Sequence, residues 1–464
     1  MQNNKNAMNN KYYSVRPIID RNLPQLFIET YGCQMNVNDS EVVLSVLQKA
    51  GYSLCSSIEK ADIILVNTCS IRDNAEQRIW GRLDVFLQEK KKKKNLIVGI
   101  LGCMAERLKE QLLEHPSVDL VAGPDSYREL AKLIAALKYD GKQINTQLLP
   151  EETYADISPV RMDRNGVSAF ISIMRGCNNM CTYCVVPFTR GRERSRNPYT
   201  IVKEAEELFN NGYKEVSLLG QNVDSYHWVD PENPTKTISF AQLLELVALI
   251  NPKLRVRFST SHPKDMGNAV LYTMAMFSNI CNHIHLPVQS GSNAMLLKMN
   301  RKYTRESYLE RVSKIREVLP DCAITADIIA GFCAETPEDQ KDTISIMEHV
   351  KYDSAFMFQY SERPNTKAAK RFPDDVDPKE KTARLNEIIE LQNRHSLESN
   401  QKCLGKTYEV LIEGVSKRSS EQLIGRTQHN KLCVFDAKGH QIGDYVNVKI
   451  NSCTQATLLS EIVE

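Results

Sequence analysis

The chain has 464 residues, which is enough for more than one domain. Hydrophobic residues make up 42% and charged residues 25%, so a wholly disordered or fibrous chain is excluded. Lys and Arg total 59 against 57 Asp and Glu, and any affinity for nucleic acid must therefore come from local patches of charge. No apolar run is long enough to cross a bilayer, so no membrane partner is expected.

The first residues, MQNNKNAMNN, lack the apolar core of a signal peptide, and residues 1–22 are predicted to form a disordered tail. The thirteen cysteines are odd in number and follow no secretion signal, which argues against a disulfide scaffold. A reducing, cytoplasmic setting is therefore expected, in which clustered cysteines serve metal binding or catalysis.

Residues 23–140 repeat one pattern three times. A β-rich run (LFIETY, IILVNT, LIVGIL) is followed by a cysteine and then by a helical pattern, which predicts a parallel α/β sheet. The cysteines are Cys33, Cys69 and Cys103, and each directly follows a predicted strand or its closing turn. Because the carboxyl ends of parallel strands share one edge, the three thiols are expected to converge there.

The rest of the chain changes character twice. Residues 141–166 are predicted to be a linker. Residues 167–398 alternate strand and helix six times, which predicts an open, partial (β/α)6 barrel with its site at the carboxyl ends of the strands. Its predicted strands are residues 169–174, 215–219, 255–260, 281–286, 323–329 and 355–360. Residues 399–464 form short β-rich runs, as in a small all-β barrel of the oligonucleotide-binding kind.

The strongest local signal is a Cys-x3-Cys-x2-Cys motif, formed by Cys177, Cys181 and Cys184 after the first predicted barrel strand. Three thiolates at this spacing suit one soft-metal centre, either zinc or an iron–sulfur cluster. A closed zinc site needs a fourth ligand, and no Cys or His lies within the next forty residues. A four-iron cluster held by three thiolates would instead leave one iron open to a small molecule. Buried structural cysteines are the simpler alternative.

Five stretches carry a resemblance to a known family. They are SIMRGCNNMCTYCVVPFTRGRERSR, LLGQNVDSY, HLPVQSGS, MNRKYTRE and ADIIAGFCAETPED. Together they resemble the methylthiotransferase family of the radical S-adenosylmethionine (SAM) superfamily, in particular its branch that acts on dimethylallyladenosine in tRNA. The resemblance covers residues 24–464. It implies an α/β chain with an amino-terminal three-cysteine domain, a radical SAM barrel and a small all-β TRAM domain that binds RNA.

The resemblance also implies an activity and its cofactors. N(6)-dimethylallyladenosine next to the anticodon of tRNA would be converted to its 2-methylthio derivative, with one SAM as methyl donor and another as radical source. Cys177, Cys181 and Cys184 would hold the SAM-cleaving [4Fe-4S] cluster, and Cys33, Cys69 and Cys103 an auxiliary [4Fe-4S] cluster. The expected partners are the tRNA anticodon loop, an electron donor of the flavodoxin or ferredoxin type, and proteins that donate iron–sulfur clusters or sulfur.

Five further residues match positions where the family contacts SAM. Gly220, Gln221 and Asn222 lie where the superfamily contacts the amino group, although the acidic residue usual there is replaced, which favours backbone contacts. Gly331 and Glu335 match a motif that contacts the adenine end, although Cys333 and Ala334 depart from its usual Pro-Gly.

Basic residues are expected to bind the RNA. Arg190, Arg192, Arg194 and Arg196 follow the cluster motif, and guanidinium groups match phosphates bidentately. Ion pairs with barrel carboxylates are the alternative for this run. In the terminal domain the candidates are Lys417, Arg418, Arg426 and Lys431. His283 and His285 share one strand face, where structural or substrate contacts are a commoner use than metal binding.

Two other functions stay open at this stage. Sister enzymes of the same family modify threonylcarbamoyladenosine in tRNA or an aspartate of a ribosomal protein. A protein of a different class would be a non-catalytic iron–sulfur sensor that binds RNA. Cleavage of SAM under reducing, anaerobic conditions separates the enzymes from the sensor.

Overall fold

The computed structural model describes residues 19–70, 73–162 and 165–463, so nearly all of the predicted tail lies outside the described residues. These residues form two compact units. The first contains the described residues up to 162 together with 170–178 and 185–204. The second contains residues 165–169, 179–184 and 205–463. Each unit is described by itself.

The first unit is built on a six-stranded parallel sheet, whose strand order is β2-β1-β3-β4-β5-β6. The strands are β1 (Gln25–Thr30), β2 (Ser53–Leu54), β3 (Ile63–Thr68), β4 (Ile97–Gly102), β5 (Leu120–Ala122) and β6 (Gln143–Asn145). The central strands β3 and β4 are apolar along almost their whole length and buried on both faces, as expected of a parallel sheet covered by helices. The predicted parallel α/β sheet is thus confirmed.

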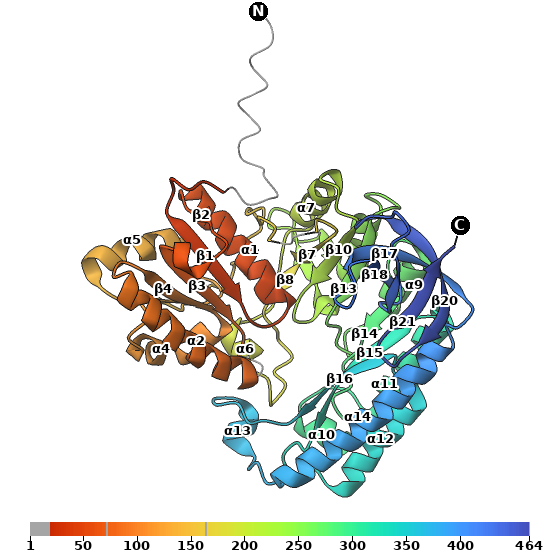
Figure 1. Cartoon of the computed structure of the whole chain (residues 1–464). Coiled ribbons are helices and arrows are strands. Elements are labelled where there is room, and N and C mark those ends of the chain that lie inside the picture. The colour runs from red at the N-terminus through yellow and green to blue at the C-terminus, as the bar shows by residue number, and fades with distance from the viewer. Residues whose placement is uncertain (1–18, 71–72, 163–164, 464) are drawn as a thin grey trace, which may run out of the picture. The chain divides into compact units, whose positions relative to one another are not determined.

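Helices cover both faces of this sheet (Figure 1). One face packs against α1 (Gln34–Lys49) and α5 (Leu130–Asp140), through Val43, Leu47 and Ile134 among others. The other face packs against α2 (Asp73–Lys92), α3 (Cys103–Leu108) and α4 (Glu110–Glu114). The remaining short elements are η1 (Ile58–Lys60), η2 (Tyr127–Glu129), β8 (Met174–Arg175), β9 (Arg194–Ser195) and α6 (Val186–Thr189).

Six strands form the barrel part of the chain, as predicted. They are β7 (Ser168–Ser172), β10 (Glu215–Leu219), β13 (Arg255–Ser259), β14 (His283–His285), β15 (Ala323–Ala330) and β16 (Ser354–Gln359). They form two three-stranded sheets, β13-β10-β7 and β14-β15-β16, and a parallel bridge between Val256 and Ile280 lies at the junction. This bridge continues the parallel strand order from β13 to the segment that enters β14.

Helices and short strands connect the barrel strands. The helices are α7 (Pro198–Asn210), η3 (Val223–Ser225), α8 (Phe240–Ala248), α9 (Asn268–Met276), α10 (Asn293–Lys298), α11 (Arg305–Val318), α12 (Pro337–Val350), α13 (Lys367–Arg371) and α14 (Pro378–Gln401), and the short strands are β11 (His227–Val229) and β12 (Thr237–Ser239). Capping boxes begin α8, α11 and α12, where Ser239, Thr304 and Thr336 accept backbone N–H groups of the first turn. Among the described residues, no helix has both the length and the apolar character needed to cross a membrane.

The last five strands close a small barrel of order β17-β18-β19-β21-β20. They are β17 (Thr407–Val415), β18 (Gln422–Thr427), β19 (Leu432–Asp436), β20 (Tyr445–Cys453) and β21 (Leu458–Ile462). Two barrel-strand arginines of the same unit bind its backbone: Arg255 donates to the carbonyl oxygen of Arg426 over 2.8 Å, and Arg257 to that of Thr427 over 2.7 Å. The predicted all-β terminal domain is confirmed.

Candidate functional site

Three thiols lie at the carboxyl edge of the first unit's sheet. Cys33 is the N-cap of α1, Cys69 directly follows β3, and Cys103 begins α3 directly after β4. A side-chain hydrogen bond with Cys69 lowers the pKa of Cys33 to about 6, against the effect of burial, and the charge of Arg190 lowers it further. Cys103 is fully buried, which raises its pKa, and it interacts electrostatically with both Arg190 and Cys33. The structure therefore brings these three predicted ligands to one edge.

Glycines make this convergence possible. Gly32, just before Cys33, has φ +136°, and a Cβ there would lie 2.5 Å from the Cβ of Cys69. Gly102, just before Cys103, has φ +88°, and a Cβ there would collide with the side chain of Asn67. Any larger residue at either position would be strained and would push neighbouring strand ends apart.

Hydrogen bonds between buried polar side chains stabilise the turns at the same edge. Asn36 donates to the Oδ1 atom of Asn67 over 3.2 Å, and Asn67 donates in return to the backbone oxygen of Asn36 over 2.9 Å. Asn67 also donates to Ser40 over 3.0 Å, and Cys33 Sγ lies 3.4 Å from Asn36 Oδ1. These buried amides have two or more partners each, so they hold the turns that carry the thiols in one geometry.

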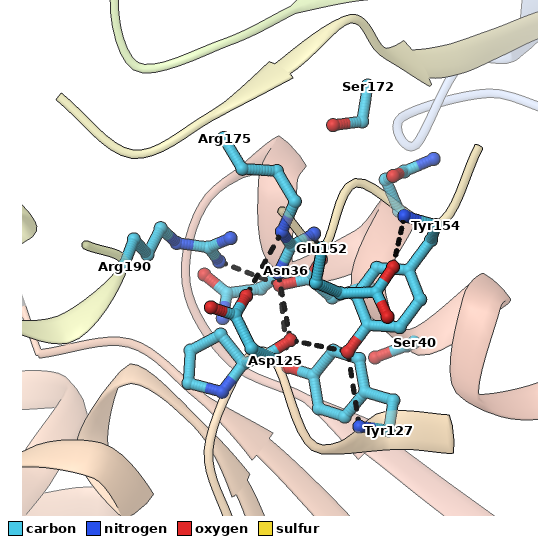
Figure 2. Close-up of polar contacts among 12 residues, drawn as sticks. Asn36, Ser40, Asp125, Tyr127, Glu152, Tyr154, Ser172, Arg175 and Arg190 are labelled. Carbon is cyan, nitrogen blue, oxygen red and sulfur yellow. Dashed lines mark hydrogen bonds and ion pairs between the residues drawn. The ribbon is translucent and has the colours of Figure 1, made fainter. Parts of the chain in front are cut away.

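A network of buried charges lies in the same unit (Figure 2). Asp39, fully buried, accepts hydrogen bonds from Arg175 over 2.7 Å and from Arg190 over 2.8 Å. Asp125 accepts from Arg194 over 2.6 Å and lies 3.6 Å from Arg175. Burial alone would raise the pKa of Asp39, but the two arginines hold it below its ordinary value. Figure 2 shows Arg175, Arg190 and Asp125 gathered with Tyr127 and Tyr154.

Three of the four arginines expected to bind RNA belong to buried ion pairs. Arg190 pairs with Asp39, Arg194 with Asp125, and Arg196 with Glu204 of α7. These three arginines therefore follow the alternative that the sequence left open, ion pairing in place of RNA binding. Two of the carboxylates, Asp39 and Asp125, come from the amino-terminal domain and not from the barrel as expected. Arg192 is exposed, so it alone of this run presents its charge to solvent in the described structure.

The donor set at the three-thiol edge fits an iron–sulfur cluster. Three buried polar atoms at or next to it have no hydrogen-bond partner in the described structure: Ser70 Oγ, Glu106 Oε2 and Arg190 Nη1. An unpaired guanidinium N–H beside thiols suits the anionic sulfur atoms of a cluster. Among the described residues no group of three His, Cys, Asp or Glu could hold a single metal ion. A four-iron cluster is larger than one ion, so its ligands need not meet at a point.

Cys177, Cys181 and Cys184 lie on one loop that is divided between the two units. Cys177 belongs to the first unit, and Cys181 and Cys184 belong to the second. In the first unit, Gly176 has φ +79°, and a Cβ there would collide with the backbone of Arg192, so only glycine fits before Cys177. The backbone N–H of Cys177 donates to the carbonyl oxygen of Gly191 over 3.1 Å. In the second unit, the N–H of Cys184 donates to the carbonyl oxygen of Cys181 over 3.1 Å, which forms a tight turn between them.

Arg301 is a site residue that the sequence did not single out. In the second unit its Nη1 donates to the sulfur of Cys181 over 3.3 Å. It lies in the MNRKYTRE stretch, which carried the family resemblance but no assigned role. No local pattern in the sequence indicated this role, because Cys181 lies 120 residues away and only the fold brings it to Arg301.

A second polar cluster lies at the carboxyl ends of β10 and β13. The predicted residues Gln221 and Asn222 each have a buried side-chain oxygen without a hydrogen-bond partner in the described structure. Asn222 Nδ2 is held by Asp265 over 2.7 Å, which aims its free Oδ1 away from that carboxylate. Asp224 and His262, which the sequence did not indicate, also carry unpartnered buried atoms. Burial raises the pKa of Asp224 to about 7 and lowers that of His262 to about 2, so His262 is neutral.

Gly331 and Glu335 are engaged with each other. The backbone N–H of Gly331 donates to Glu335 Oε1 over 2.9 Å, and Arg384 donates to the same oxygen over 2.8 Å. Gly331 has φ +70°, and a Cβ there would collide with Lys381. In this structure Glu335 therefore stabilises the turn after β15.

The remaining predicted residues divide by exposure. Lys417 and Arg418 are exposed, whereas Arg426 forms an ion pair with Glu413 at 3.3 Å and Lys431 one with Asp353 at 3.0 Å. His283 and His285 both hydrogen bond to the hydroxyl of Thr325 over 3.0 Å, which is a structural role.

The chain matches three family descriptions in turn. Residues 25–123 match the uncharacterized protein family UPF0004, residues 171–347 the Radical SAM superfamily, and residues 401–463 the TRAM domain. A protein of Bacteroides fragilis named tRNA-2-methylthio-N(6)-dimethylallyladenosine synthase is 57% identical over 439 residues, 95% of this chain and 96% of its own. The chain belongs to the family of these synthases. A namesake from Amoebophilus asiaticus is 56% identical over 96% of this chain and 93% of its own.

Solved structures show the same fold at low identity. The radical S-adenosylmethionine methyltransferase TsrM of Kitasatospora setae is 15% identical, with a TM-score of 0.55 over 74% of this chain and 75% of its own. The radical SAM enzyme OxsB, also 15% identical, has a TM-score of 0.52 over 81% of this chain and 57% of its own. The expected family and the α/β layout of three parts are thus confirmed.

The Asp39 network yields a stability prediction. Asp39→Ala leaves Arg175 without its closest anion and Arg190 without any carboxylate partner, and should lower the free energy of unfolding by about 3–5 kcal/mol. Urea denaturation measures the loss. The matched control is Asp156→Ala, which removes an exposed partner of Arg128 and should cost about 0–1 kcal/mol. Equal losses in the two variants would contradict a central role for Asp39.

Proposed function

We propose that this protein converts N(6)-dimethylallyladenosine next to the anticodon of tRNA to its 2-methylthio derivative, with one SAM as methyl donor and a second as radical source. The family relationship supports the reaction class. The observation that carries the proposal is the presence of two separate three-cysteine groups, one of which, Cys33, Cys69 and Cys103, converges at a sheet edge. A radical enzyme that only cleaved SAM would need one such group.

The number of ligands fits this chemistry. The ring hydrogen to be replaced is neither acidic nor next to a leaving group, so acid–base catalysis by side chains does not suffice. When bound, the two [4Fe-4S] clusters supply one-electron and sulfur chemistry. The protein supplies three thiolates to each cluster, a fixed turn for every one of Cys33, Cys103 and Cys177, and nearby guanidinium groups.

We place SAM at the carboxyl ends of β10 and β13. The α-ammonium group of SAM needs acceptors, and Asn222 Oδ1 and Gln221 Oε1 are buried acceptors without partners in the described structure. Buried polar atoms are rarely left unpaired, because each costs free energy. Asp224 adds a carboxyl group, and neutral His262 adds a ring nitrogen, Nε2, without a partner.

The tRNA substrate must present an unstacked base, which an anticodon loop does. Among the predicted RNA contacts, Arg192, Lys417 and Arg418 are exposed, and they are our candidates for contacts with phosphate. We propose a cytoplasmic setting in which an electron donor of the flavodoxin or ferredoxin type and a donor of sulfur or clusters act as partners.

Iron content tests the two-cluster assignment. After anaerobic reconstitution we expect about eight irons per chain, falling to about four in a variant with Cys177, Cys181 and Cys184 all replaced by Ala. Replacing Cys33, Cys69 and Cys103 should also leave about four irons, with SAM cleavage retained and methylthiolation of dimethylallyladenosine-containing tRNA lost. Four irons in the wild type that disappear in the first variant would remove the auxiliary cluster and favour a single-cluster enzyme or a sensor.

Calorimetric titration with SAM tests its site. Asn222→Ala removes one acceptor for a charged donor, and the dissociation constant of SAM should rise about tenfold. Asn211→Ala, which removes an exposed asparagine after α7, is the control and should leave SAM affinity unchanged. An unaltered affinity in Asn222→Ala would exclude its side chain from the SAM site.

Salt dependence of tRNA binding tests the exposed cations. Combined Arg192→Glu, Lys417→Glu and Arg418→Glu substitutions should weaken binding and make the slope of log affinity against log salt concentration less negative, because fewer counterions are released from phosphates. Lys341→Glu, on the exposed face of α12, is the control. Identical slopes for the triple variant and the wild type would show that tRNA binds elsewhere.

A further inference from the structure

Arg301 differs from every other buried arginine in the described part of the chain. Eight others lie in buried positions, and each forms an ion pair with Asp or Glu: Arg161, Arg175, Arg190, Arg194, Arg196, Arg255, Arg257 and Arg384. Arg301 is 5% exposed, and no carboxylate partner is found for it among the described residues. A buried guanidinium without an anion is costly, which indicates that an anion is supplied by something else.

The contacts of Arg301 show where that anion belongs. Nη2 donates to the carbonyl oxygen of Pro287 over 3.0 Å, and Nε donates to the hydroxyl of Tyr303 over 3.1 Å. The Tyr303 hydroxyl itself donates to the carbonyl oxygen of Val288 over 2.7 Å, which fixes it in place. These neutral contacts orient the guanidinium so that Nη1 faces Cys181 Sγ at 3.3 Å. A neutral thiol is a weak acceptor, whereas a thiolate bound to iron carries negative charge.

Hydrogen bonds between residues 180–182 and 298–300 hold Arg301 close to Cys181. The N–H of Thr182 donates to the carbonyl oxygen of Met299 over 3.0 Å, and its hydroxyl donates to that of Lys298 over 2.9 Å. Asn300 donates to the carbonyl oxygen of Met180 over 2.9 Å. Met180 and Asn300 both have positive φ, 53° and 60°, a conformation that non-glycine residues seldom adopt. The loop with Cys181 and the segment before Arg301 are therefore held together by side chain and backbone alike.

We propose that Arg301 is a positioning residue for the SAM-cleaving cluster and that its guanidinium stabilises the reduced state of that cluster. The inference rests on the proposed function, in which Cys181 is a cluster ligand. Reduction transfers one electron from a one-electron donor to the cluster, adds one negative charge, and breaks no bond. A fixed cation that donates an N–H to a ligand sulfur favours the more negative state, so Arg301 raises the reduction potential.

Redox titration of Arg301→Gln tests the proposal. The titration uses a background in which Cys33, Cys69 and Cys103 are Ala, so that one cluster remains, with dithionite as reductant and electron paramagnetic resonance of the reduced cluster as the readout. We expect the ratio of reduced to oxidised cluster at a given potential to fall about tenfold, which is about 59 mV for one electron. An unchanged midpoint would overturn the proposal.

Arg305→Gln is the matched control. Arg305 lies in the same stretch and donates to the carbonyl oxygen of Gly291 over 3.1 Å and to Ser345 over 3.0 Å, contacts that involve no thiol. Its midpoint should equal that of the parent. A shift as large as that of Arg301→Gln would mean that both changes act through general disturbance of the fold, and would also overturn the proposal.

Tyr303→Phe provides the test if Arg301→Gln does not fold or does not bind iron. This variant keeps the guanidinium and removes the hydroxyl that accepts from Nε, so the midpoint should shift in the same direction by less. No shift would overturn the proposal. Absence of iron in the parent triple-alanine protein would instead contradict the cluster assignment of the proposed function, and this inference would fail with it, whereas an unchanged midpoint would leave that assignment in place.

Discussion

Asp39 is the group on which the three-thiol edge depends. It lies on α1, six residues after Cys33, and its two oxygens accept hydrogen bonds from Arg175 and Arg190. Arg190 in turn interacts with Cys33 and Cys103, so one carboxylate connects the position of the helix, the buried cations and the thiols. In a low-dielectric interior such a network is stabilising only when every charge has its partner, and the loss of one member exposes the others to the full cost of burial.

The two cysteine groups have similar electrostatic surroundings. Each has a buried arginine beside it, Arg190 at Cys33 and Cys103 in the first unit and Arg301 at Cys181 in the second. The two arginines are held differently, since Arg190 is anchored by a carboxylate and Arg301 by neutral oxygens. An arginine that already has Asp39 as partner contributes less net positive charge to its surroundings than an unpaired one. This difference would suit the two proposed clusters, of which only the SAM-cleaving one has to accept an electron.

The sequence predicted those features that follow from local pattern. Apolar, β-branched runs predicted β1, β3 and β4 of the first unit and the six barrel strands, and a cysteine after each of those first three strands predicted that the thiols lie at one edge. The strands β2, β5 and β6 were missed because two or three residues are too few to show a period. The roles of Arg190 and Arg194 were not evident because their partners, Asp39 and Asp125, lie 151 and 69 residues away in the sequence. The sequence shows that a run of arginines is positively charged, but it does not show which carboxylates the fold places beside them.

The residues around Asn222 were only partly predictable for a related reason. A motif match indicates the backbone position, but an unpaired atom exists only after every other partner has been assigned in space. Asp224 carries a pKa raised to about 7 by burial, so at neutral pH the fold pays a cost to keep a carboxyl group there. A hydrophobic side chain would remove that cost. The unpartnered atoms of Asn222, Asp224 and His262 support the proposed SAM site, because a polar ligand would complete their hydrogen bonds when it binds.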